Sequence, residues 1–241
     1  MAARTGRLVG VGVGPGDPEL VTAQAVRVLR EADVVVAPSM AVDSVGRAES
    51  IVRQVAAGVD VERVVFVMTE HNDERAQALE AAAAQLIEHL DRGRCVAFVT
   101  LGDPNIYSTF PAVASVVRRL RPGVPIETAA GIMAFQDLAA RAGSVLLDGR
   151  ESMTLVTALD GPAALDAALA DPDRAIVVYK GGRHLPAIAA RLAEAGRLDG
   201  AVVGELLGLP GERWGPAKEL SDRPASYLAT VIVPPMGRSA S

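Results

Sequence analysis

Three short segments of the sequence combine glycine with polar side chains directly after apolar runs. They are Gly12–Thr22, Gly102–Phe110 and Ala130–Phe135. Because glycine has no Cβ, the backbone at these places can turn sharply and a ligand can approach it closely. Asp103 can accept a hydrogen bond from a ligand hydroxyl or amine, and Tyr107 can donate one. The segments therefore indicate either a surface that binds a small molecule or a set of tight turns and helix caps.

Other chemistries fit the sequence poorly. A G-x-G-x-x-G dinucleotide fingerprint fails in the first segment, because Pro15 and Asp17 stand where the third glycine is needed. The sequence has no phosphate-binding loop closed by lysine and Ser or Thr, no G-x-S-x-G elbow and no H-E-x-x-H pair. Cys95 is the single cysteine, which excludes an internal disulfide and a cysteine-based zinc site. We therefore expect neither covalent catalysis nor a bound metal.

The overall composition restricts the possible partners. The formal net charge is -5, and proteins that bind nucleic acid usually carry a basic face, so we expect no nucleic-acid partner. No apolar run approaches the length of roughly 18 residues that a membrane-spanning helix needs. The N-terminal stretch lacks the apolar core and cleavage site of a signal peptide. These features predict a cytoplasmic protein that does not interact with membranes.

The three segments follow apolar runs that alternate with amphipathic stretches, a pattern typical of a parallel sheet covered by helices. The strands predicted for the first half are apolar throughout, as expected for strands that are buried on both faces. They are Leu8–Val13, Val34–Ala37, Val64–Met68, Val96–Thr100 and Ile126–Ala129. The helices predicted between them are Pro18–Glu31, Arg47–Ala56, Asp73–Arg92, Ser108–Leu120 and Met133–Ala142. In a parallel sheet, the loops after the strands meet at one edge, where open α/β sheets bind ligands.

The second half has the same kinds of element in a different order. Its predicted strands are Met153–Thr157, Ile176–Tyr179, Val202–Leu206 and Leu228–Val233, with helices at Pro162–Leu169 and Leu185–Ala195. The last strand follows a Gly/Pro-rich segment without an obvious crossover helix, which favours a mixed sheet. The sequence thus predicts an α/β fold of two domains, residues 1–130 with a parallel sheet and residues 131–241 with a mixed sheet.

The order and spacing of three motifs resemble the tetrapyrrole (corrin and porphyrin) methylase family. The motifs are G-V-G-P-G-D-P-E-L-V-T at Gly12–Thr22, G-D-P-N-I-Y-S-T-F at Gly102–Phe110 and A-G-I-M-A-F at Ala130–Phe135, and the resemblance extends from Leu8 to Val233. It implies two α/β domains with an active-site cleft between them, a homodimer, and S-adenosylmethionine bound in the cleft as methyl donor. The sulfonium methyl of this donor is already activated, so the reaction requires alignment and exclusion of water rather than a metal.

The resemblance also implies which residues contact the donor. They are Leu101, Gly102, Asp103, Ile106, Met133, Ala134, Ala158, Leu159, Lys180, Leu206 and Leu207. Family members that methylate uroporphyrinogen commonly have methionine at the position of Lys180, and an ammonium beside a sulfonium is repulsive. We therefore expect Lys180 to contact the donor through its backbone or stem and to turn its ammonium toward the substrate.

The remaining candidates concern the substrate, which the resemblance implies is a tetrapyrrole with several carboxylates. Asp17 and Tyr107 are candidates to accept or hold protons, although water or a substrate nitrogen could serve equally. Because the net charge opposes a polyanion, binding requires local cations near strand ends, with the glycine-rich loop as a further contact. The predicted substrate contacts are Gly14, Pro15, Gly16, Arg47, Arg183 and His184, and Arg141 and Lys180 are further cations of this kind.

Within the family, three stretches look most like the members that methylate precorrin-2 at ring carbon C20. They are Gly102–Phe110, Gly46–Ala48 and L-G-L-P-G-E at Leu207–Glu212, followed by the closing Y-L-A-T-V-I-V. Three alternatives remain open at this stage: the same reaction on a cobalt-containing substrate, methylation at another ring position, and a module that binds a nucleotide-like ligand without turnover.

Overall fold

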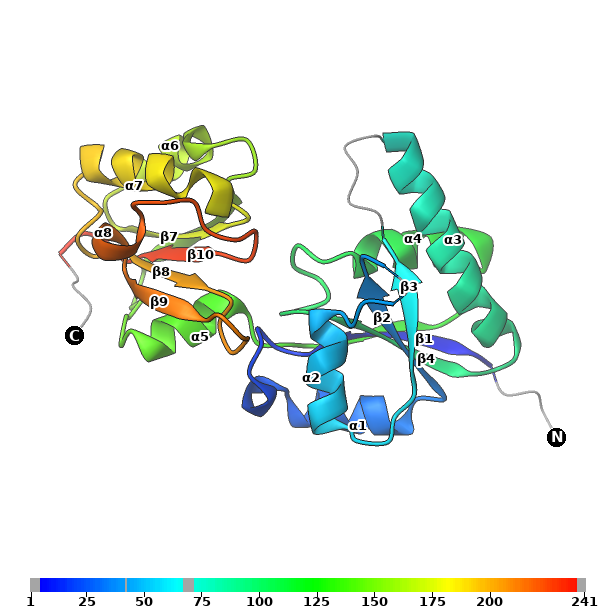
Figure 1. Cartoon of the computed structure of the whole chain (residues 1–241). Helices are drawn as coiled ribbons and strands as arrows, with labels where there is room; N and C mark the ends of the chain where they lie inside the picture. Colours follow the sequence, from blue (N-terminus) through cyan, green and yellow to red (C-terminus); the bar gives the residue numbers. More distant parts are fainter. Residues whose placement is uncertain (1–4, 42, 67–71, 238–241) are drawn as a thin grey trace. The chain divides into compact units, whose positions relative to one another are not determined.

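Two compact α/β units make up the chain (Figure 1). The computed structural model describes residues 5–41, 43–66 and 72–237. The first unit is Met1–Met133 and the second is Ala134–Ser241, whereas the sequence placed the boundary at residue 130. Each unit contains a five-stranded sheet.

The sheet of the first unit is entirely parallel, as predicted, with the strand order β3-β2-β4-β1-β5. Its strands are β1 (Arg7–Gly12), β2 (Val34–Ser39), β3 (Val61–Val65), β4 (Cys95–Thr100) and β5 (Ile126–Ala129). Gly12 pairs with Thr100, and Val11 pairs with Ala129. The carboxyl ends of β1, β4 and β5 therefore lie side by side at one edge of the sheet.

Helices cover both faces of this sheet (Figure 1). They are the 3-10 helix Pro18–Leu20, α1 (Ala23–Glu31), α2 (Arg47–Val55), α3 (Asn72–Asp91) and α4 (Phe110–Leu120). On one face, α1 and α2 pack Leu29 and Ile51 into a core with the side chains of alternate strand residues. On the other face, α3 and α4 pack Leu86 and Val113 around Phe98. This burial on both faces explains the mainly apolar sequences of the central strands β1, β2 and β4, whereas the edge strands β3 and β5 also carry exposed polar residues such as Glu62 and Glu127.

Two elements of this unit differ from the prediction. The helix predicted at Pro18–Glu31 is interrupted, because the Thr22 hydroxyl accepts the Ala25 N–H at 3.1 Å and so starts α1 afresh after the 3-10 turn. The Thr22 hydroxyl also donates to the Ala130 carbonyl at 3.2 Å, which ties this turn to the loop after β5. The strand predicted at Val64–Met68 begins earlier, at Val61, and Met68 lies outside the described residues.

The second unit has a mixed sheet, as predicted, with the order β6-β7-β10-β8-β9. Its strands are β6 (Ser152–Thr157), β7 (Arg174–Tyr179), β8 (Val202–Glu205), β9 (Arg213–Pro216) and β10 (Thr230–Val233). Only β6 and β7 pair in parallel, and the other pairs are antiparallel. The prediction missed β9, because Gly215 and Pro216 disfavour a strand by propensity; an edge strand tolerates both.

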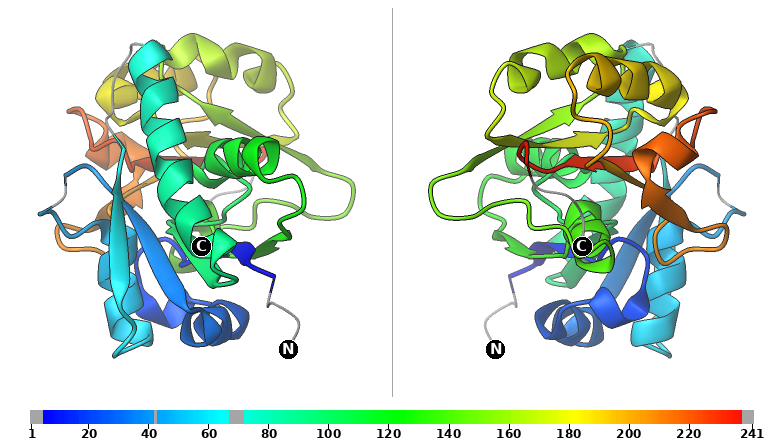
Figure 2. Two further views of the ribbon diagram at one scale, coloured as in Figure 1. Left: turned by 90° about the vertical axis from the view of Figure 1, so that its right-hand side faces the viewer. Right: turned by 90° about the vertical axis from the view of Figure 1, so that its left-hand side faces the viewer.

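The sheet of the second unit also lies between helices (Figure 2). They are α5 (Ala134–Arg141), the 3-10 helix Pro162–Leu165, α6 (Asp166–Leu169), the 3-10 helix Gly182–His184, α7 (Leu185–Glu194) and the short α8 (Ala217–Leu220). Leu138 of α5 packs on one face, and Ile188 and Leu192 of α7 pack on the other. No helix in the described parts of the chain is long and apolar enough to cross a membrane.

Candidate functional site

Four glycines lie in contact at the carboxyl edge of the first sheet. The Gly102 N–H donates to the Gly14 carbonyl at 2.8 Å, which joins the loops after β1 and β4. A Cβ at Gly12 would lie 2.5 Å from the Gly102 carbonyl oxygen, and a Cβ at Gly131 would overlap the same oxygen. These glycines are therefore required because backbone packs directly on backbone. Gly102 itself has φ +64°, and a Cβ there would lie 3.1 Å from Sδ of Met133.

Asp103 fixes two of these loops to each other. Its carboxylate is buried, with Oδ1 accepting the Asn105 N–H at 2.9 Å and Oδ2 accepting the Gly131 N–H at 3.0 Å. The side chain therefore links the loop after β4 to the loop that leads to Met133. The hydrogen bond from a ligand that the sequence suggested for Asp103 stays a prediction.

The candidate proton acceptors lie in the loops after β1 and β4. Asp17 caps the 3-10 helix, because its Oδ1 accepts the Glu19 N–H at 2.9 Å. Gly14, Pro15 and Gly16 form the turn between β1 and this cap. Tyr107 follows Ile106 in the loop after β4, and its side chain is 45% exposed. Arg47, a candidate substrate cation, is exposed at the first position of α2.

Backbone strain coincides with the predicted site. Within the described ranges, the non-glycine residues with positive φ are Tyr107 (52°), Lys180 (59°) and Leu206 (54°). A side chain in the left-handed region is unfavourable and persists only where the surrounding structure holds it in place. All three residues were selected from the sequence as site residues, and such strain clusters at functional sites.

The second unit gathers its predicted donor contacts at one edge of its sheet. Thr157, Tyr179, Thr230 and Gly204 form a row across four paired strands, β6, β7, β10 and β8. The residues that follow this row on β6, β7 and β8 include Ala158, Leu159, Lys180, Leu206 and Leu207. The Ala158 N–H donates to the Tyr179 carbonyl at 3.0 Å and extends the pairing into the loop.

The predicted cations of the second unit have partners within the protein. Arg183 donates from Nη2 to the Leu159 carbonyl and from Nε to Nε2 of His184 at 2.9 Å. The Nζ of Lys180 lies 5.6 Å from the ring centroid of Tyr227, a cation–π contact. Arg183 and His184 thus lie against Leu159, which is a predicted donor contact.

Sequence reasoning missed several residues that hold this edge. The Tyr179 hydroxyl accepts the Phe135 N–H at 3.0 Å and joins the end of β7 to the first turn of α5. Glu205 accepts the Ser226 N–H at 2.5 Å and pairs with Arg213 at 3.1 Å. Burial raises the pKa of Glu205, but these two partners outweigh it and the net shift is downward. The only sequence signal was the position of Tyr179 and Glu205 directly before Lys180 and Leu206.

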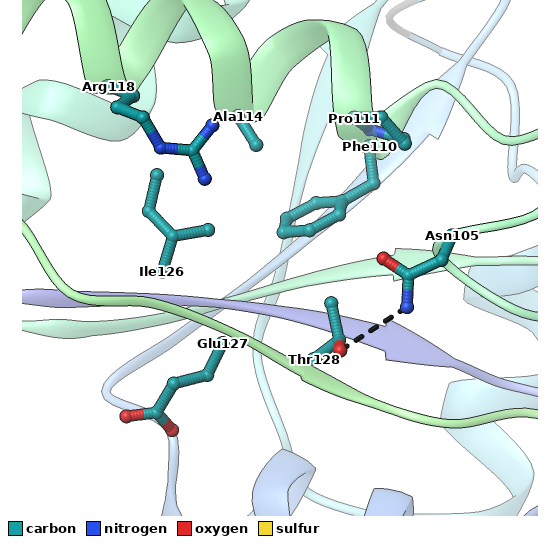
Figure 3. A pocket seen from close by; sticks show the side chains of 8 residues that line it. All are labelled: Asn105, Phe110, Pro111, Ala114, Arg118, Ile126, Glu127 and Thr128. Atoms are coloured by element: carbon teal, nitrogen blue, oxygen red, sulfur yellow. Dashed lines mark hydrogen bonds between the residues drawn. The ribbon is translucent and has the colours of Figure 1, made fainter.

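A cavity of about 360 Å³ lies between α4 and the edge strand β5 (Figure 3). The guanidinium of Arg118 extends over it beside Ile126, and the Asn105 amide donates to the Thr128 hydroxyl at 3.3 Å. Glu127 points away from the Phe110 ring, in keeping with the alternation of side chains along a strand. The cavity reaches the Asp103 loop through Asn105. No group of three or more His, Cys, Asp or Glu side chains suited to a metal ion occurs among the described residues.

Comparisons with known proteins agree with this fold. The tetrapyrrole (corrin/porphyrin) methylase family matches residues 7–220. A precorrin-2 C(20)-methyltransferase from Sinorhizobium sp is 34% identical over 238 residues, covering 95% of each chain. A cobalt-precorrin-2 C(20)-methyltransferase from Salmonella typhimurium is 32% identical over 233 residues, covering 95% of this chain and 96% of the relative. The structure of a Thermus thermophilus uroporphyrin-III C-methyl transferase complexed with S-adenyl homocysteine is similar in fold, with TM-score 0.62, 24% identity and coverage of 95% and 97%.

The parallel sheet with glycines at its strand ends and the mixed second sheet define an α/β protein of two sheets, a fold that the solved methyltransferase structure shares. The chain belongs to the tetrapyrrole (corrin/porphyrin) methylase family. It is therefore a tetrapyrrole methyltransferase.

Proposed function

We propose that the chain is an S-adenosylmethionine-dependent C-methyltransferase of cobalamin biosynthesis that methylates precorrin-2 at C20 to give precorrin-3A. The observation that carries the proposal is the identity of 34% and 32%, over 95% of the chain, with two C20-methyltransferases. Gly102–Phe110 and Leu207–Glu212, the stretches that suggested this reaction from the sequence, both lie in the loops of the candidate site.

The backbone at the strand ends fits a bound methyl donor. At Gly102, the left-handed backbone carries no Cβ and its nearest neighbour there is the flexible Met133 side chain, so a donor could contact main-chain groups closely. In the second unit, Ala158, Lys180 and Leu206 follow β6, β7 and β8 at one edge of the sheet, and their backbones could supply the remaining contacts. S-adenosylmethionine, when bound, supplies an activated methyl group.

The protein's own residues then have to bind the substrate, orient it and accept a proton from it. Alignment of donor and acceptor carbon accounts for most of the rate in a reaction of this type. After transfer, a proton must leave the methylated carbon. Asp17 suits this role because only its Oδ1 is engaged in the described structure, which leaves Oδ2 able to accept a proton. Tyr107, held in its left-handed conformation in the loop after β4, could orient the substrate by a hydrogen bond.

The two relatives differ in whether the substrate contains cobalt, and their identities to this chain are almost equal. The second candidate function is therefore methylation of cobalt-precorrin-2 at C20. In this second case the cobalt belongs to the substrate and not to the protein. We also expect a homodimer, which sedimentation velocity would report as twice the mass of one chain.

A turnover assay tests the proposed function. Purified protein is incubated with S-adenosylmethionine and, in parallel, with precorrin-2, cobalt-precorrin-2 or uroporphyrinogen III, and S-adenosylhomocysteine is quantified. We expect release with precorrin-2 at the highest kcat/KM. Turnover only with the cobalt substrate would favour the second candidate, and turnover only with uroporphyrinogen III would assign an earlier step. Binding of the donor without release in any mixture would indicate a ligand-binding module.

A further inference from the structure

The loop after β8 has a conformation that needs external support. Leu206 has φ +54°, and its carbonyl accepts the Leu209 N–H at 2.9 Å in a first turn. The Glu212 N–H donates to the Leu209 carbonyl at 3.0 Å in a second turn. Because a leucine in the left-handed region is strained, these turns need further contacts to hold one conformation.

Glu212 supplies such contacts with both of its carboxylate oxygens. Oε2 accepts the Gly208 N–H at 2.5 Å, and Oε1 accepts Nη1 of Arg141 at 2.8 Å. The first contact closes the loop onto its own beginning, two residues after Leu206. The second is a charge-assisted hydrogen bond, which is stronger than one between neutral groups.

Arg141 anchors this carboxylate to α5. Its Nε donates to Oδ1 of Asp137 at 2.8 Å, one turn earlier on the helix, and both side chains are largely shielded from solvent. Leu207 is buried in the same region, in a cluster that contains Leu138 of α5. The loop is therefore fixed to α5 by an apolar contact and by the chain of charges from Asp137 through Arg141 to Glu212.

We propose that Glu212 is a positioning residue for the methyl donor, holding Leu206 and Leu207 in the conformation that contacts S-adenosylmethionine. Arg141 acts through Glu212 and does not serve as a cation for the substrate. The inference rests on the proposed function, because the donor contacts of Leu206 and Leu207 are part of it. It also assigns a physical role to the last residue of the L-G-L-P-G-E stretch.

Donor affinity measured by calorimetry tests this role. We expect Glu212→Ala to raise the S-adenosylmethionine Kd about tenfold, because a charge-assisted contact is lost and the strained loop is released. The tetrapyrrole KM and the kcat at saturating donor should stay close to those of the parent protein. Glu212→Gln keeps an oxygen for Gly208 but loses the charge, so its Kd should be intermediate. Glu219→Ala, which removes an exposed carboxylate from α8 of the same unit, is the matched control and should leave the Kd unchanged.

The outcomes separate this inference from the proposed function. If the parent protein binds no S-adenosylmethionine, the proposed function fails and the inference falls with it. If the parent binds the donor and folded Glu212→Ala binds it equally well, only the inference is overturned. A rise in tetrapyrrole KM with unchanged donor Kd would also overturn it. Should Glu212→Ala not fold, Arg141→Met removes the side chain that anchors Glu212, and an unchanged donor Kd in this folded variant would also overturn the inference.

Discussion

Gly102 shows at the scale of one residue why a glycine motif can be predicted but not fully explained from the sequence. The spacing of glycines and polar residues was sufficient to select the loops after β1, β4 and β5. The structure adds that Gly12 and Gly131 are required because their backbones pack against the Gly102 carbonyl. Gly102 has a positive φ and faces the Met133 side chain rather than backbone, so we expect it to be the glycine of this group that contacts a ligand.

Comparing Gly102→Ala with an alanine at a distant positive-φ glycine should distinguish the cost of backbone strain from an effect on donor binding. We expect Gly102→Ala to destabilise the fold by roughly 1–2 kcal/mol, the usual cost of a side chain in the left-handed region. It should also weaken S-adenosylmethionine binding, because the new Cβ occupies the space beside Met133. Gly58 provides the control, since it has φ +87° and a Cβ there would meet no atom within 4 Å. Gly58→Ala should lose similar stability in thermal unfolding but keep the donor Kd; equal Kd values for both variants would remove Gly102 from the site.

Lys180, whose Nζ lies 5.6 Å from the ring centroid of Tyr227, stays a predicted substrate cation of the second unit. We expect Lys180→Met, which keeps the stem, to raise the tetrapyrrole KM several-fold and to reduce its dependence on salt, because one screened ion pair is lost. The donor Kd should not rise. Lys218→Met, at an exposed lysine of α8, is the control and should change neither constant. An increase in donor Kd alone would show that Lys180 serves the donor instead.

The side chains that the sequence did not reveal act across long separations. Tyr179 and Phe135 are 44 positions apart, and Arg141 and Glu212 are 71 positions apart. Such pairs form only after the sheet and α5 have assembled, so no local pattern indicates them. The residues predicted to contact a ligand through their backbone were easier to select. Glycines and the ends of apolar runs can be read directly from the sequence.

At the scale of elements, continuous apolar strands and capped helices could be predicted because each is specified locally. The parallel first sheet and the mixed second sheet followed from the order of these elements. The edge strand β9 could not be predicted, because it depends on pairing with β8, and the interruption at Thr22, although a local cap, was hidden by an otherwise continuous helical pattern. Strand propensity is a weak guide where tertiary contacts decide whether a segment joins a sheet.

One buried carboxylate joins α2 to β3. The Glu49 side chain has no exposed surface and accepts hydrogen bonds from Arg63 at 2.7 Å and from Arg53 at 2.6 Å. The hydrogen bond from Arg63 is the main cause that lowers the pKa of Glu49 to about 2, against the opposing effect of burial and with a further contribution from Arg53. Because the pKa is lower in the folded state than the ordinary value of 4.5, ionised Glu49 stabilises the fold above about pH 4.5. This contribution is lost as the pH falls toward 2.

Substitution of Glu49 should therefore alter the acid stability of the first unit. We expect Glu49→Gln to lower the free energy of unfolding at pH 7 by roughly 1–3 kcal/mol. The variant should also lose part of the decline in stability that the parent shows between pH 4.5 and pH 2. Glu31→Gln is the control, because Glu31 forms an exposed pair with Arg27 within α1, and such pairs contribute little. Denaturant titrations at several pH values provide the measurement, and parallel pH profiles for Glu49→Gln and the parent would contradict this account.

At the scale of the whole molecule, two units with separate cores each present a sheet edge that bears predicted site residues. The net charge of -5 disfavours a polycarboxylate at long range, so we expect recognition to depend on individual cations, with Lys180 and Arg47 as candidates. Neither the fold nor the charge specifies which carbon of the ring is methylated. That carbon is the one the protein holds in line with the sulfonium, about 3–3.5 Å from the methyl group.

The position of the transferred methyl group is the most direct test of the proposed function. The protein is incubated with precorrin-2 and S-adenosylmethionine labelled with carbon-13 in the methyl group, without added metal, and the product is examined by NMR. We expect one labelled methyl per tetrapyrrole, attached to C20. A label on any other ring carbon would contradict the assignment to C20 methylation and would leave only membership of the methylase family.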